Sequence, residues 1–219
     1  MKDINKIIKI DMLSIYPYLT LKNFIIILVM GLFYPLISKN KYTIYGLTQL
    51  FGILYSSYPF LVGDESGIDA LYGAFAIERK KVVYGRYIWS NLVIIICLII
   101  SITFSVLVSI LIKEAIEVDE LIYIIPIMFI ISNLIIAGQY PFYFKYGYAK
   151  SKIIMTSMYF IMAVLTFIMV YFKDILIKNM GFLFNNIYLL IFSSLLFFII
   201  LYISSIIASV KAYKNREFN

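Results

Sequence analysis

The sequence predicts an all-α, polytopic membrane protein with six transmembrane helices in a single transmembrane domain, 1–219. Hydrophobic residues make up 63% of the chain and charged residues only 14%, whereas an average soluble domain has roughly 25% charged residues. Long runs lack Asp, Glu, Lys and Arg, and a helix needs about 20 apolar residues to cross a bilayer core of about 30 Å. The chain has too few charges to cover a soluble surface, so we expect it in the cell membrane.

Each predicted span is an uncharged apolar run, and the six runs are 23–38, 42–62, 87–112, 121–144, 153–172 and 187–210. The first run is the shortest and contains Pro35, and only residues 39–41 separate it from the second. Two arrangements stay open for this pair, namely two separate spans or one re-entrant hairpin. Residues 173–186 are predicted to form an external loop, with a re-entrant segment as the alternative.

The distribution of basic residues predicts the orientation of the spans. Most of the 19 Lys and Arg residues fall in the connections on one side, together with both termini. Because connections rich in Lys and Arg stay in the cytoplasm, both termini are expected there. The net charge of +7 then reflects contact with anionic headgroups, and no nucleic-acid partner is needed to explain it.

Residues 1–20 are predicted to form a cytoplasmic helix that lies flat at the membrane interface. Their apolar residues recur at helical spacing, with lysines between them: Ile4, Ile7, Ile8, Met12 and Ile15. This amphipathic pattern is typical of interfacial helices. Pro17 is expected to turn the chain toward the first span.

The longest hydrophilic connection, 63–86, lies between the second and third predicted spans on the cytoplasmic side. Ser66 and Asp69 have the spacing of a capping box at a helix start. The next apolar residues recur at helical spacing along a short helix: Ile68, Leu71, Tyr72 and Phe75. A free helix of this length is marginal in water. Its apolar side therefore packs either on the protein's own helix ends and lipid headgroups, or on a separate cytoplasmic protein.

The run from Phe75 to Tyr87 resembles the segment before the third span in the ABC type-2 transporter permease family, the membrane subunits of bacterial ABC exporters. Asp64 or Glu65 matches its acidic residue, Ile77 its isoleucine, and Arg79 with Lys80 its basic pair. Ala76 stands where proline is common in that family. The resemblance implies that this connection docks an ATPase through the following residues: Asp64, Glu65, Ile68, Asp69, Leu71, Tyr72, Phe75, Ile77, Glu78, Arg79 and Lys80.

The same resemblance implies a homodimer or heterodimer of permease chains, each with a cytoplasmic ABC ATPase subunit that holds ATP and Mg. The sequence itself favours a transport subunit that is not an enzyme and carries no cofactor. It has no phosphate-binding loop of the G-x-x-x-x-G-K-[ST] type. It has no His, its only cysteine is Cys97 in an apolar run, and its spans hold no carboxylate. We expect Cys97 to be a small buried core residue.

Three amides inside the spans, Gln49, Asn133 and Gln139, are candidates for a transport path. The alternative is that they form hydrogen bonds between helices. The uncharged, apolar spans favour hydrophobic or amphipathic cargo, such as a bacteriocin-like or toxin-like peptide or a drug, and the resemblance implies export. A second interpretation is a non-transporting immunity or accessory protein that binds a partner.

Many tyrosines fall near the ends of the predicted spans, and we expect them to anchor the helices at the membrane interface. Contact with cargo is the alternative. These residues are Tyr42, Tyr58, Tyr87, Tyr123, Tyr140, Tyr143, Tyr146, Tyr171 and Tyr188.

Overall fold

The computed structural model describes residues 2–38, 40, 42–69, 72, 77–113, 118–156 and 187–216, and these ranges contain helices and turns but no strand. The all-α prediction is therefore confirmed. The helices are α1 Lys2–Ile15, the 3-10 helix η1 Tyr16–Tyr18, α2 Leu21–Ser38, α3 Thr43–Ser66, α5 Arg79–Ile112, α6 Val118–Tyr146 and α9 Ile187–Lys214. Residues 148–156 are also helical.

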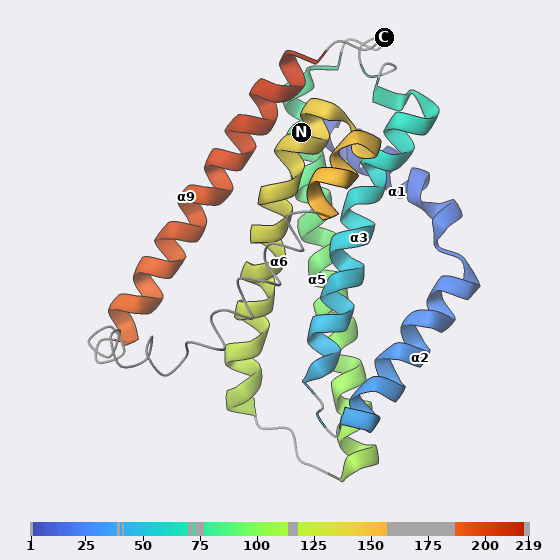
Figure 1. Cartoon of the computed structure of the whole chain (residues 1–219), viewed down its shortest axis with the longest axis vertical. Coiled ribbons are helices and arrows are strands. Elements are labelled where there is room, and N and C mark those ends of the chain that lie inside the picture. The colour runs from blue at the N-terminus through green and yellow to red at the C-terminus, as the bar shows by residue number, and fades with distance from the viewer. Residues whose placement is uncertain are drawn as a thin grey trace.

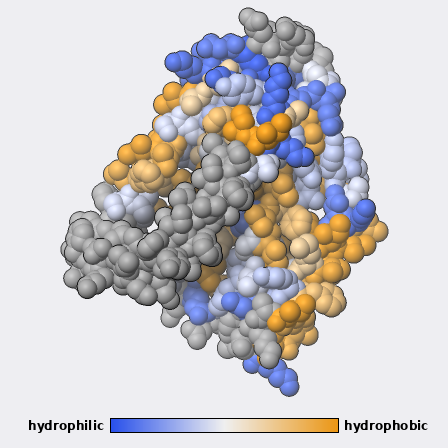
Figure 2. Space-filling model, viewed as in Figure 1, coloured by the Kyte–Doolittle hydropathy of each residue, from blue (hydrophilic) through white to orange (hydrophobic). Residues whose placement is uncertain are grey.

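The long helices form an elongated bundle in which α3, α5 and α6 run side by side (Figure 1). Helix α2 flanks α3 on one side and α9 flanks α6 on the other. Helices α2 and α5 run in one direction, and α3, α6 and α9 run in the opposite direction. As a result α1, the end of α3, the start of α5 and the end of α9 lie at one end of the bundle. Hydrophilic residues gather at this end, and apolar residues cover much of the face below it (Figure 2).

Three of the described helical segments are long and apolar enough to cross a membrane: Arg79–Ile112, Glu120–Tyr146 and Ser193–Lys214. A fourth results if Asp3–Tyr18 and Leu21–Ile37, which meet at a bend of 80°, count as one broken span. Helix α3 covers the predicted second span, but its hydroxyl and amide residues keep it out of this set. The predicted fifth span and the loop 173–186 lie largely outside the described residues. Six spans therefore stay a prediction.

The core near the hydrophilic end contains a cluster of aromatic rings. The ring of Phe60 on α3 lies 4.8 Å from Tyr140, 5.1 Å from Tyr143 and 4.8 Å from Phe144 on α6. Tyr87 on α5 lies 4.9 Å from Tyr140. Edge-to-face pairs at such distances add stability beyond burial alone. Helices α3, α5 and α6 are held together here by aromatic contacts.

Three of the predicted interfacial tyrosines are instead part of this core. Tyr87, Tyr140 and Tyr143 are buried, so the prediction that they anchor at the lipid surface is wrong. Their hydroxyls find partners inside the bundle, since Tyr140 donates a hydrogen bond to the Ser56 carbonyl at 2.8 Å and Tyr87 pairs with Ser205 at 2.6 Å. Cys97 is buried as expected.

Candidate functional site

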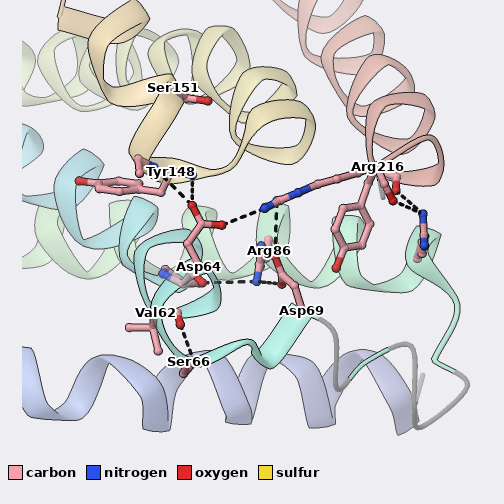
Figure 3. Close-up of polar contacts among 12 residues, drawn as sticks. Val62, Asp64, Ser66, Asp69, Arg86, Tyr148, Ser151 and Arg216 are labelled. Carbon is pink, nitrogen blue, oxygen red and sulfur yellow. Dashed lines mark hydrogen bonds and ion pairs between the residues drawn. The ribbon is translucent and has the colours of Figure 1, made fainter. Parts of the chain in front are cut away.

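Five ionisable side chains gather at the hydrophilic end of the bundle, and Figure 3 shows Asp64, Asp69, Arg86 and Arg216 among them. We call them the charged cluster: Asp11 of α1, Asp64 of α3, Asp69 of the connection after α3, Arg86 of α5, and Arg216 after α9. The segments that bring them together are far apart in the sequence. Almost every described element at this end of the bundle therefore contributes a charge.

Arg86 is the centre of the cluster and is 0% exposed. Its Nη2 donates a hydrogen bond to Asp69 Oδ1 at 2.6 Å and another to the Pro59 carbonyl at 3.3 Å. The guanidinium carbon also lies 4.4 Å from the centre of the Phe60 ring, in the range of a cation–π contact. A buried charge is costly unless it is paired and hydrogen-bonded. Arg86 therefore fixes Asp69 and the chain around it against α5.

Asp64 and Arg216 form the second ion pair of the cluster, with 2.9 Å between Asp64 Oδ1 and Arg216 Nη2. The other carboxylate oxygen of Asp64 accepts hydrogen bonds from the backbone N–H groups of Tyr148 and, at 3.3 Å, Ala149. These groups begin the helical residues 148–156, where a carboxylate is a favourable cap. Asp64 thus joins the end of α3 to this helix and to the chain end after α9.

Gly147 makes the close approach of Asp64 possible. Its φ is +79°, and a Cβ atom at this position would lie 2.6 Å from Asp64 Oδ2 and 3.0 Å from Arg216 Nη2. Any side chain here would be strained by the left-handed backbone and would also displace the carboxylate. The turn between α6 and residues 148–156 is therefore built around glycine.

Asp11 brings α1 into the cluster. Its side chain is only 2% exposed, and its Oδ1 accepts a hydrogen bond from the Tyr72 hydroxyl at 3.5 Å. Burial raises the pKa of Asp11 to about 7, although the nearby Arg86 acts in the opposite direction. Each of the two ion pairs, Arg86–Asp69 and Asp64–Arg216, is neutral by itself. Asp11 is then the odd carboxyl group, and desolvation favours its protonated form.

Two further contacts attach the start of α5 to its surroundings. Arg79 Nη1 donates to the carbonyls of Tyr213 at 2.9 Å, Lys214 at 2.7 Å and Arg216 at 3.0 Å. A cation at the C-terminus of α9 satisfies free carbonyls and complements the helix dipole. Lys81 forms an ion pair with Asp3 of α1 at 2.9 Å, which also lowers the pKa of Asp3.

The predicted ATPase-coupling residues divide into an outer and an inner group. Glu65, Glu78 and Lys80 are exposed, and Ile68, Ile77 and Arg79 are half-buried. Asp64, Asp69 and Tyr72 point into the charged cluster or its neighbourhood, so their described contacts are with the chain's own helices. Leu71 and Phe75 lie outside the described residues. Asp64, Asp69 and Tyr72 are the inner residues, and the exposed Glu65, Glu78 and Lys80 are the outer residues. Arg79 also forms hydrogen bonds to the end of α9, and Ile68 and Ile77 pack against the core.

The predicted capping box is wrong. Helix α3 continues to Ser66, and the Ser66 hydroxyl donates back to the Val62 carbonyl at 2.5 Å. Gly67, with φ +68°, ends α3 as its C-cap. Asp69 pairs with Arg86 instead of capping a helix. Glycine is favoured in the left-handed conformation at helix ends, and this signal outweighs the Ser-x-x-Asp spacing.

The three amides proposed for a transport path are all buried. Gln49 Oε1 on α3 accepts a hydrogen bond from Ser132 on α6 at 2.9 Å, which is the interhelical alternative raised above. Asn133 Nδ2 donates to the Phe129 carbonyl of its own helix at 3.0 Å. A cavity of about 590 Å³ lies between α1, α2, α3 and α5, and none of the three amides lines it. Their role in transport stays a prediction.

Sequence reasoning missed Asp11, Arg86 and Arg216 as site residues, because it assigned their segments to the interface and to topology. One signal was present for Asp11. It stands between Ile7 and Ile15 at intervals of four, on the same side of α1 as these two buried residues. No group of three or more potential metal ligands occurs within the described part of the chain.

An all-helical bundle with long apolar helices and charges gathered at one end defines a polytopic membrane protein. The chain belongs to the ABC-2 transporter family, because a family profile described as "ABC-2 family transporter protein" matches residues 6–214. This match includes α3, α5 and the connection between them. No curated protein and no solved structure matches the chain. The resemblance drawn from residues 64–87 is therefore confirmed at the level of the family.

Members of this family are membrane permease subunits that generally work with an ATPase subunit. The chain is accordingly a membrane protein and a permease-type subunit of a transporter. Its charged cluster lies at the end of the bundle that carries the connection 63–86.

Proposed function

We propose that this permease subunit receives the work of ATP hydrolysis through residues 63–86, from a separate cytoplasmic ABC ATPase subunit that holds ATP and Mg. The observation that carries the proposal is the anchoring of this connection at both ends. Asp64 and Asp69 fix its start to Arg216 and Arg86, and Arg79 fixes its end to the last turn of α9. A push on the connection therefore reaches α5, α9 and residues 148–156 together.

The inner contacts are suited to transmit force because they are desolvated. Arg86 and Asp69 lie in a low-dielectric environment, where separating a close ion pair leaves two uncompensated buried charges. The ion pair resists separation, so the connection and the start of α5 move as one body. The outer residues Glu65, Glu78 and Lys80 are exposed and carry both signs of charge, which suits recognition of a complementary protein surface.

We further propose that two such chains, identical or different, form the transport path and export hydrophobic or amphipathic peptides or drugs. The uncharged runs of the predicted spans support this cargo class, because a strongly charged solute would find no compensating charge there. Both termini lie in the cytoplasm in this arrangement, on the same side as the charged cluster. The chain itself then performs no catalysis and binds no cofactor.

The competing function is a non-transporting immunity or accessory protein that binds a partner. Membership in the ABC-2 family favours the permease. The two functions differ in one measurable respect, since only a permease changes the hydrolysis rate of an ATPase subunit.

A photo-crosslinking amino acid at Lys80 or Glu65, introduced in cells, tests the proposed docking surface. We expect it to capture an ABC ATPase subunit, identified by mass spectrometry. The double charge reversal Glu78→Lys with Lys80→Glu should abolish co-purification of that subunit and its permease-dependent ATPase rate, while membrane insertion persists. Lys211→Glu, an exposed reversal on α9, is the matched control and should keep both. Unchanged association in the double variant would refute the proposed surface.

A further inference from the structure

A cavity of about 590 Å³ lies between the bent pair α1–α2 and the helices α3 and α5. Its walls are almost entirely apolar and include Ile15, Leu21, Phe51, Trp89, Cys97 and Ile100. Its volume is in the range of sites that bind small ligands, roughly 300–1,000 Å³. The charged cluster and the amides Gln49, Asn133 and Gln139 do not line it.

The cavity has the length of one membrane leaflet. Along α5 its lining runs from Trp89 to Ile100, and this stretch of helix is about 16 Å long at 1.5 Å per residue. Half of a hydrocarbon core of about 30 Å is about 15 Å. The other wall begins at Leu19–Leu21, where the chain bends by 80° between η1 and α2. The cavity therefore extends from the level of the bend toward the middle of α5.

Basic residues lie close in sequence to two of the lining residues. Lys22 directly follows Leu21, and Lys9 lies one helical turn before Met12, which also lines the cavity. Both lysines are exposed, and neither forms an ion pair within the part of the chain that the structure describes. The indole N–H of Trp89 is buried and has no hydrogen-bond acceptor among the described residues.

We propose that this cavity binds one acyl chain of an anionic membrane lipid, whose headgroup lies between Lys9 and Lys22. An apolar slot as deep as a leaflet matches a single lipid chain. The two lysines provide the positive charge that an anionic headgroup requires. The site goes beyond the proposed coupling to an ATPase, and only the identity of the leaflet, the cytoplasmic one, rests on the proposed topology.

The chain offers a direct reporter for this site, because Trp89 is its only tryptophan. The purified full-length protein is reconstituted into vesicles of phosphatidylcholine that contain a small fraction of brominated phosphatidylglycerol or brominated phosphatidylcholine. Bromine quenches indole fluorescence on contact. We expect brominated phosphatidylglycerol to quench Trp89 at lower mole fractions than brominated phosphatidylcholine of the same chain length.

Variants separate the cavity from general lipid contact. Each basic residue near an anionic lipid contributes about 1 kcal/mol, or about a fivefold preference. Lys9→Glu and Lys22→Glu should each reduce the preference for the anionic lipid by at least about fivefold, whereas the exposed Lys152→Glu should leave it unchanged. Ile100→Phe, which fills the inner end of the cavity, should weaken quenching by both lipids. Circular dichroism confirms that each variant remains folded.

Two outcomes would overturn the proposal. Equal quenching by the two lipids, unaffected by Ile100→Phe, would mean that Trp89 contacts only bulk lipid. Relief of quenching by an added hydrophobic peptide, with no preference for the anionic lipid, would mean that the cavity holds cargo instead. Because neither readout involves an ATPase, failure here leaves the proposed coupling surface standing, and failure of that surface leaves the lipid site standing.

Discussion

Arg86 and Asp69 form an ion pair of 2.6 Å in which the two side chains are only 1% and 4% exposed. The pair joins α5 to the connection that follows α3, across 17 residues of sequence. Asp11, Asp64 and Arg216 surround it, so that one buried charge pair organises the end of the bundle where α1, α3, α5 and α9 converge. In a chain with so few charged residues, this concentration supports the proposed coupling role.

Removing one partner of this pair should be strongly destabilising. Asp69→Asn keeps the shape of the side chain but leaves Arg86 as an uncompensated buried charge, which costs about 3–5 kcal/mol in comparable sites. Thermal or denaturant unfolding of the purified protein in detergent measures the loss. The double variant Asp69→Leu with Arg86→Met removes both charges and should recover most of the stability. A single variant as stable as the wild type would show that the pair is not buried in the membrane-embedded protein.

Gly147→Ala tests the turn that holds Asp64. The left-handed backbone costs an alanine about 1–2 kcal/mol, and its Cβ would displace the carboxylate that caps residues 148–156. We expect a loss of stability of at least this size. Gly138→Ala is the matched control, because no atom lies within 4 Å of its Cβ position inside α6. There alanine should be neutral or stabilising by up to about 1 kcal/mol. Equal behaviour of the two variants would contradict the described turn.

The helices were predictable because apolar runs in membranes have few alternatives to helix. The helices extend beyond the predicted spans where charged residues continue a helix past the apolar run. Helix α3 includes Asp64 and Glu65, and α5 begins at Arg79 rather than Tyr87. A charge ends a membrane-embedded stretch but does not end a helix. At α3 the charges also find partners, since Tyr18 donates to Glu65 at 3.0 Å and Arg216 pairs with Asp64.

The segment that carries the candidate site was predictable from the sequence, but the contacts between residues inside the site were not. The resemblance directed attention to residues 63–86, and these residues do supply Asp64, Asp69 and Arg79. Arg216, the partner of Asp64, and Asp11, the partner of Tyr72, lie far away in sequence, and only the packing of α9 and α1 brings them close. Residue spacing carries no information on such distant pairs. Burial also reverses the expected exposure of Asp69 and Tyr72, because each has a polar partner inside the bundle.

The contact of α1 with α5 depends on Gly85. A Cβ at this position would lie 2.8 Å from Cγ2 of Ile7, a side chain that is fully buried. Gly85→Ala should therefore push α1 away and increase hydrogen exchange of its backbone amides, residues 2–15. Gly46→Ala, whose Cβ position has no atom within 4 Å, should leave exchange unchanged. Adding Ile7→Ala to Gly85→Ala makes room for the new methyl group and should restore part of the protection. If Gly85→Ala alone leaves α1 protected, α1 is held by other contacts.

The attachment of α1 should also depend on pH through Asp11. Its pKa is raised from the ordinary 3.8 to about 7 by burial, so the folded protein holds a proton that the unfolded chain has lost between these values. The contribution of Asp11 to stability is therefore greatest below pH 4, declines as pH rises toward 7, and levels off above 7. At about 1.4 kcal/mol per pKa unit, the full decline is at most about 4 kcal/mol.

The facing groups, Arg86 of α5 and Asp69 and Tyr72 of the connection, are common to wild type and variant. Asp11→Asn, which resembles the protonated form, should unfold at about the same temperature as the wild type below pH 4 and at a higher temperature at pH 8. A wild type that is already more stable than the variant at pH 8 would mean that Asp11 is ionised and paired with Arg86.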